Sequence, residues 1–176
     1  MIGSLVLAAA LLLGTAGPAK LVAPGVAAMT LQRVWNRVPM PALAVRAAAV
    51  VEVAVALAVL TRGDRGSAVA LGCCYLAFTA LTVWLVATRQ GTSCGCFGGA
   101  ESPVGVIHLV LNLLCAGVAV SAALRPPGPL GGLLEGGALP AAVGIGQAAL
   151  LAYLGFLSIT ALPALNAARR RLMEAQ

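Results

Sequence analysis

Two cysteines, Cys94 and Cys96, lie one residue apart in the glycine-rich segment GTSCGCFGG at positions 91–99. A disulfide between cysteines this close closes a very small ring. Gly95 between them accepts the unusual backbone dihedrals of such a ring at the least steric cost. A strained, exposed disulfide is easier to reduce than a structural one. The pair therefore predicts dithiol–disulfide chemistry in a water-accessible loop.

Other interpretations of this pair stay open. The two thiols can remain unpaired, or their disulfide can act only as a static staple for the loop. Metal capture is a further alternative, but two sulfurs are too few for a closed zinc site and more ligands would be needed. The sequence therefore predicts no metal site.

The composition decides what kind of chain carries this loop. Of its 176 residues, 61% are hydrophobic and 9% are charged, whereas soluble domains average about 45–50% apolar and about 25% charged residues. A soluble enzyme, a disordered tail and a disulfide-stapled secreted module are excluded. With so few charges, the net charge of +6 indicates membrane topology and contact with anionic lipid, not nucleic-acid binding.

The apolar residues form stretches long enough to cross a bilayer, which takes roughly 20 residues per helix. Alternating β-barrel patterning is absent, so helices are the spanning structure that satisfies the backbone. The first stretch lacks a basic start and continues past Gly17 and Pro18, so we expect a retained helix, not a signal peptide. The prediction is an all-α integral membrane protein, a four-helix transmembrane bundle plus a fifth C-terminal transmembrane helix, with spans at 2–23, 42–61, 67–88, 103–124 and 139–164.

The breaks between the spans suggest how the chain is divided. Residues 1–125 form the four-helix membrane unit, with the cysteine loop at 89–102. A Pro/Gly-rich linker follows at 126–138, and residues 139–176 hold the fifth helix and a basic tail.

Ionisable side chains are scarce within the predicted spans. Charges there are costly and usually face a bundle interior or a cavity. The rise of a helix places Lys20, Arg46 and His108 beneath the cysteine loop, and Glu52 deeper. Positive groups near a thiol favour the reactive thiolate. Lys20 and His108, together with the acidic Glu52, are predicted to tune the reactivity of Cys94 and Cys96. Two alternatives stay open, a structural Lys20–Glu52 ion pair and an Arg46 that reaches up to the lipid headgroups.

Three polar or sulfur-bearing residues share one face of the fourth span, since His108, Asn112 and Cys115 are four and three residues apart. His108 is the chain's one histidine, which makes it the candidate for a proton shuttle or for a hydrogen bond to a quinone. A histidine bonded within the bundle is the alternative. Asn112 and Arg46 are the other residues expected to contact a quinone.

The remaining cysteines are Cys73, Cys74 and Cys115. They lie too deep in the spans for direct exchange with the loop, because a disulfide needs Cα atoms within about 7 Å. We expect them to serve as small apolar residues, with a second redox pair as the alternative.

Three stretches together resemble a known family. The CGCFG motif at 94–98, placed before a helix in a small multi-span protein, is similar to that of the methylamine-utilisation membrane proteins (MauE), which are related to DoxX-like membrane proteins. The segment GPAKL at 17–21 is similar to the family's Gly-x-x-Lys signature, and Glu52 lies where the family carries an acidic residue. The resemblance covers roughly residues 2–124.

The resemblance implies a membrane redox helper that works with a thioredoxin-like partner and supports disulfide formation in an exported client, such as an amine dehydrogenase subunit. A quinone is the candidate electron carrier within the membrane. No residue in the chain points to methylamine itself, so the substrate does not follow from the fold. Two hypotheses from other classes are a non-catalytic assembly or chaperone subunit and a small metal-handling membrane protein.

Two arguments disagree about the side of the membrane that the loop faces. The positive-inside rule favours the cytoplasm, because the basic residues on the loop side outnumber those opposite. The family resemblance and the scarcity of stable disulfides in the cytosol favour the outside, which is the prediction. The loop-side residues are Arg33, Arg37, Arg89 and Arg169 to Arg171, against Arg62, Arg65 and Arg125.

Overall fold

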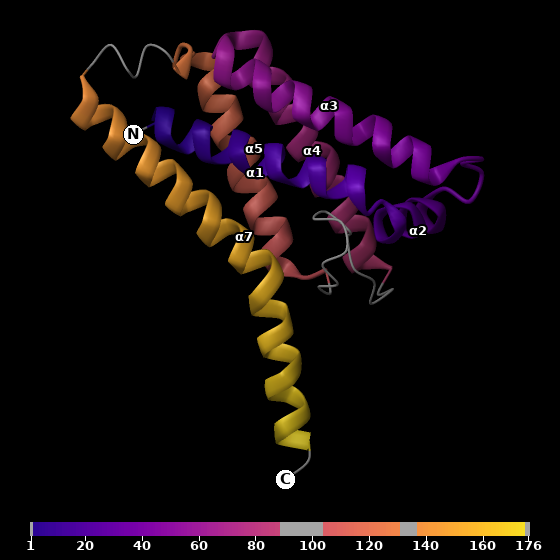
Figure 1. Ribbon diagram of the computed structural model, residues 1–176. Helices are drawn as coiled ribbons and strands as arrows, with labels where there is room; N and C mark the ends of the chain where they lie inside the picture. The colour runs from indigo at the N-terminus through magenta and orange to yellow at the C-terminus, as the bar shows by residue number, and fades with distance from the viewer. Residues whose placement is uncertain (1, 89–103, 131–136, 175–176) are drawn as a thin grey trace.

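The protein is a bundle of helices, seen in a computed structural model that describes residues 2–88, 104–130 and 137–174 (Figure 1). Within these ranges there is no strand. Five helices are long and apolar enough to cross a membrane, which confirms the all-α integral membrane class. The helices are α1 (Ile2–Val22), α2 (Gly25–Val34), α3 (Pro41–Thr61), α4 (Arg65–Ala87), α5 (Val106–Leu124) and α7 (Ala138–Glu174).

The observed boundaries agree with the predicted spans to within a few residues, except at the end of the last one. There α7 continues as a helix to Glu174, and its spanning part is Ala138–Ala161. The C-terminal part of α7 extends away from the bundle (Figure 1). The basic residues at 169–171 would no longer favour a cytoplasmic cysteine loop if the fifth segment turned back within the membrane. In the structure α7 is one continuous helix.

Helix α2 was not expected, because spans are predicted from stretches of about 20 apolar residues and its segment is shorter. Its ten residues, Gly25–Val34, are too few to cross a bilayer. No helix was predicted between the first two spans. In the structure α2 packs against α3 and buries Ala28.

Helix α1 is the centre of the bundle. It packs against α3, α5 and α7 and is the most buried of the spanning helices. Small residues allow the close approaches, as where Ala148 of α7 is buried against Leu7 and Ala8 of α1. The fifth helix therefore lies along α1 (Figure 1), in contact with the four-helix unit.

The turn between α3 and α4 is fixed to the chain that follows α5. The backbone N–H of Gly128 donates to the carbonyl of Gly63 at 3.2 Å, and Arg65 Nε donates to the carbonyl of Ala123 at 2.9 Å. Gly63 has φ +55°, a conformation that glycine adopts without steric cost. These bonds hold the end of the bundle opposite the one where α4 ends and α5 begins.

Candidate functional site

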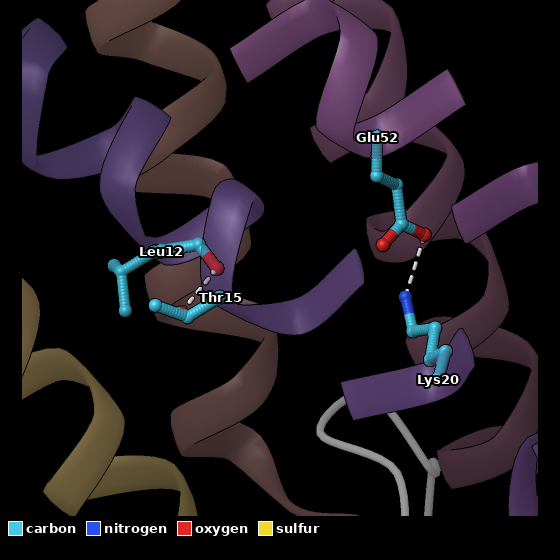
Figure 2. A network of polar contacts seen from close by, with 4 residues as sticks. All are labelled: Leu12, Thr15, Lys20 and Glu52. Carbon is cyan, nitrogen blue, oxygen red and sulfur yellow. Dashed lines mark hydrogen bonds and ion pairs between the residues drawn. The ribbon is translucent and has the colours of Figure 1, made fainter. Parts of the chain in front are cut away.

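A buried ion pair joins α1 to α3. Lys20 Nζ lies 2.6 Å from Glu52 Oε1, and the two side chains are 7% and 5% exposed (Figure 2). Among the described residues this is the one ion pair. The structure therefore brings together two predicted site residues and shows the interhelical ion pair that the sequence had left as an alternative.

Gly17 explains why Lys20 reaches this position. A Cβ atom at Gly17 would lie 2.6 Å from Val53 Cγ2 and 2.9 Å from the carbonyl oxygen of Ala49. Only glycine lets α1 approach α3 this closely. Lys20 follows three residues later on the same helix face, opposite Glu52. The Gly-x-x-Lys pattern thus has a physical meaning, since the glycine sets the helix distance and the lysine uses it.

Glu52 has one satisfied and one unsatisfied oxygen. Oε1 accepts from Lys20, while Oε2 is buried and has no hydrogen-bond partner among the described residues. A buried oxygen of this kind is usually satisfied by ordered water. Glu52 Oε2 is therefore free to accept a hydrogen bond from a further donor, such as a water molecule.

Aromatic residues of α4 line the other side of Lys20. The Lys20 Nζ lies 4.5 Å from the centroid of the Phe78 ring, within the range of a cation–π interaction. Phe78 in turn packs edge to face with Tyr75, with ring centroids 6.2 Å apart. The Tyr75 hydroxyl donates to the carbonyl of Ala9 at 2.7 Å. Tyr75 therefore packs within the bundle, and Phe78 is a contact of Lys20 that the sequence did not reveal.

A second polar group lies between α4 and α5. His108 and Asn112 are both buried, at 2% and 8% exposure. His108 Nδ1 accepts from the backbone N–H of Gly105 at 3.4 Å, so a neutral ring carries its proton on Nε2. Asn112 Nδ2 donates to Thr82 Oγ1 at 3.4 Å. With buried Cys115, these residues do share one face of α5, as the spacing predicted.

A cavity of about 30 Å³ lies beside the second group. Phe78 and Tyr75 form one part of its wall, His108 and Asn112 another, and apolar side chains of α1, α5 and α7 the rest. Its volume has room for about one or two water molecules. Lys20 contacts the Phe78 ring, so one aromatic side chain separates the ion pair from the cavity.

The other predicted residues are not brought into this cluster. Arg46 is exposed on α3, on a different face from buried Glu52. Cys73, Cys74 and Cys115 are free thiols that are exposed, half-buried and buried, respectively. Within the described parts of the chain, no group of three or more metal-ligating side chains is found. Cys94 and Cys96 lie outside the described residues.

Five apolar helices, two of them joined by a buried ion pair, define an all-α, multi-pass membrane protein. The chain matches the family model of the methylamine utilisation protein MauE over residues 1–125, and it belongs to that family. The match ends where α5 ends, before α7. No curated protein and no solved structure matches the chain. The family resemblance expected from the sequence is confirmed, and it makes this a membrane protein of methylamine utilisation.

Proposed function

We propose that this protein is a membrane thiol–disulfide redox protein whose reactive pair is Cys94 and Cys96. It exchanges electrons with an extracytoplasmic thioredoxin-like protein and supports disulfide formation in exported clients. Membership of the MauE family and the CGCFG motif at 94–98 support the proposal. The observation that carries it is a pair of buried polar groups that share one neighbour, Phe78. Lys20 of the Lys20–Glu52 pair, near the end of α1, lies over the Phe78 ring, and His108 and Asn112, near the start of α5, line the same cavity as Phe78.

The exchange itself needs no further reactant. One thiolate of the pair attacks a sulfur of the partner's disulfide, forms a mixed disulfide and releases the partner's second sulfur as a thiolate. The other cysteine of the pair then attacks the mixed disulfide and frees the partner as a dithiol. Two electrons and two protons pass from Cys94 and Cys96 to the partner. In the reverse direction a thiolate of the reduced partner attacks the Cys94–Cys96 disulfide, and two electrons and two protons pass to Cys94 and Cys96. This direction oxidises the partner, so it is the one that supports disulfide formation in clients.

The buried polar residues would act on this reaction as positioning residues. The Lys20–Glu52 pair holds the end of α1 against α3, and Glu52 Oε2 offers a further acceptor. His108 can hold a proton on Nε2, the nitrogen not engaged by Gly105. Proton movement must accompany disulfide formation, so these are the groups in the bundle suited to it.

A quinone is the proposed electron carrier on the membrane side. The polar groups that would hold its ring oxygens are His108 and Asn112, and Phe78 and Tyr75 supply an aromatic wall. The chemistry of this lining suits a quinone, but a cavity of about 30 Å³ is the size of water molecules. A quinone ring does not fit without movement of side chains. Arg46, exposed on α3, is not part of this lining.

We place the cysteine loop outside the cytoplasm. Stable disulfides belong to oxidising compartments, and the proposed partner and client are exported. The basic residues around 169–171 lie beyond the spanning part of α7, and the positive-inside rule favours the reverse. A membrane-impermeant maleimide applied to intact cells tests the orientation. Labelling of Cys94 and Cys96 before lysis supports the proposal, and labelling only after lysis contradicts it.

The proposed activity is tested by replacing both loop cysteines with serine. In cells carrying Cys94→Ser with Cys96→Ser, the exported client should accumulate free thiols, measured by the gel shift after alkylation with a polymer-linked maleimide. Cys73→Ser is the matched control, because Cys73 is an exposed thiol of α4 outside the reactive pair. A client with normal disulfides in the double variant would leave a non-catalytic assembly role as the better account.

A further inference from the structure

The chain between α1 and α3 forms a surface that the redox proposal does not use. We call residues 25–40, which comprise α2 and the turn after it, the α2 corner. It exposes three large apolar side chains, Met29, Trp35 and Met40, at 56%, 68% and 63% exposure. Arg33 and Arg37 are exposed beside them.

The position of the α2 corner follows from its neighbours. Helix α1 ends at Val22 and α3 begins at Pro41, and both are membrane-spanning, so the chain between them lies at a membrane face. Helix α2 has ten residues and is about 15 Å long, about half the thickness of the hydrocarbon core. Helix α2 is therefore too short to cross the bilayer, and it packs on α3 at the membrane interface.

Helix α2 has two distinct faces. Ala28 is buried toward α3, while Gly25, Met29, Gln32 and Arg33 are exposed. The exposed positions follow the spacing of one helix face, because they are four, seven and eight residues from the first. This outer face carries one large apolar, one polar and one basic side chain, Met29, Gln32 and Arg33.

The charge of the region has one sign. Arg33, Arg37 and Arg46 are all exposed, and no Asp or Glu occurs between positions 21 and 51. None of the three arginines forms an ion pair within the described residues. Guanidinium groups bind phosphate through two parallel hydrogen bonds. The unpaired cations thus match a phosphate-bearing surface at the level of the membrane interface.

We propose that the α2 corner binds the phosphate groups of anionic lipids, with Arg33 and Arg37 as ligands and Trp35 as the interfacial anchor. Tryptophan is enriched at membrane–water interfaces because one end of its ring is apolar and the other is polar. Each basic residue near an anionic surface increases the affinity for that surface about fivefold. The site fixes the height of α1 and α3 in the leaflet on the side of the cysteine loop. The redox exchange of Cys94 and Cys96 does not depend on it.

The test uses the two tryptophans of the chain. The full-length Trp84→Phe variant keeps Trp35 as the one fluorophore and is reconstituted in vesicles that contain brominated phospholipid. At equal mole fraction, brominated phosphatidylglycerol should quench Trp35 more than brominated phosphatidylcholine does. Bromine near the headgroup should quench more than bromine near the chain end.

Matched variants identify the ligands. Replacing Arg33 and Arg37 with glutamine in the Trp84→Phe background should remove the preference for the anionic lipid, whereas Arg62→Gln at the opposite end should retain it. Equal quenching by the two lipids with both arginines present overturns the proposal. So does quenching by aqueous iodide without quenching by lipid, which would fit a partner protein instead. Loss of the preference on adding millimolar inorganic phosphate would overturn the lipid assignment in favour of a free-phosphate site.

Discussion

Lys20 of α1 and Glu52 of α3 meet in a 2.6 Å ion pair inside a bundle that has no other ion pair within its described residues. Taking two charges out of water costs several kcal/mol per ion, and apolar replacements of a buried pair are often as stable or more so. The pair is therefore weak evidence for a role in stability. Its cost is better explained if the reaction uses the pair.

Removing one partner of this pair should be costly. Lys20→Met leaves the Glu52 carboxylate buried without its cation, and we expect a loss of about 3–5 kcal/mol in the free energy of unfolding. Lys20→Met combined with Glu52→Leu should recover most of that loss. The measurement is denaturant unfolding in detergent micelles, followed by helix content.

Arg46→Gln is the control for this experiment, because Arg46 is an exposed cation on the same helix as Glu52. Its change should stay within about 0.5 kcal/mol. If Lys20→Met and Arg46→Gln lowered the free energy of unfolding equally, burial of the ion pair would have no measurable effect on stability.

The contact at Gly17 predicts opposite effects of the same substitution at two sites. Gly17→Ala places a Cβ against Val53 and the backbone of Ala49, and overpacking of this kind costs about 1–3 kcal/mol. Gly117→Ala, in α5, meets nothing within 4 Å and should stabilise by about 0.4–1 kcal/mol. Thermal unfolding in micelles measures both. A neutral Gly17→Ala variant would contradict the close approach of α1 and α3.

The N-terminal cap of α4 predicts a pH dependence. Asp64 accepts a 2.8 Å hydrogen bond from the backbone N–H of Ser67, which lowers the pKa of its carboxyl below the ordinary value, with a smaller contribution from Arg62. Because the folded pKa is lower than the unfolded one, the stabilisation is complete above the unfolded pKa and is lost as pH falls through the folded pKa. Asp64→Asn keeps an acceptor that does not titrate.

The observable is the difference in unfolding midpoint between the original chain and Asp64→Asn, which cancels the titration of other groups. It should be constant from pH 7 to about pH 5 and should shift in favour of the asparagine variant below about pH 4. A difference independent of pH down to pH 2.5 would mean that the cap bond does not depend on the charge.

His108 predicts a change in the pH profile of the redox reaction. His108→Gln should slow client oxidation by about 10²-fold, the lower end of the usual contribution of general acid–base groups, and should flatten the pH dependence of the rate. Leu111→Met, which alters the same cavity wall at nearly constant volume, should keep the profile. A slower reaction with an unchanged profile in His108→Gln would indicate a purely structural histidine.

The spans could be predicted because hydropathy is a property of the sequence alone, and their ends agree with the helices to within a few residues. Helix α2 could not be predicted in the same way, since ten residues carry too little hydrophobic periodicity to stand out. The direction in which the Arg46 side chain points could not be predicted either. Helix rise gives the depth of a residue in the membrane but not the direction of its side chain.

The ion pair was only half predictable. Two opposite charges in neighbouring spans suggest each other, so Lys20 and Glu52 could be named. Phe78 could not, because an aromatic residue in an apolar span looks like any packing residue until Lys20 is placed over its ring. The one hint was that Tyr75 and Phe78 are three residues apart, and so lie on one face of α4.

The central claim is that Cys94 and Cys96 exchange disulfides with a thioredoxin-like partner, and covalent trapping tests it most directly. Cys94→Ser and Cys96→Ser are expressed singly, and the complexes are separated without reductant. One of the two should accumulate an adduct with a thioredoxin-like protein that is released by dithiothreitol and is absent from the double serine variant. If neither single variant forms such an adduct while Cys73→Ser and the original chain behave alike, the account is wrong.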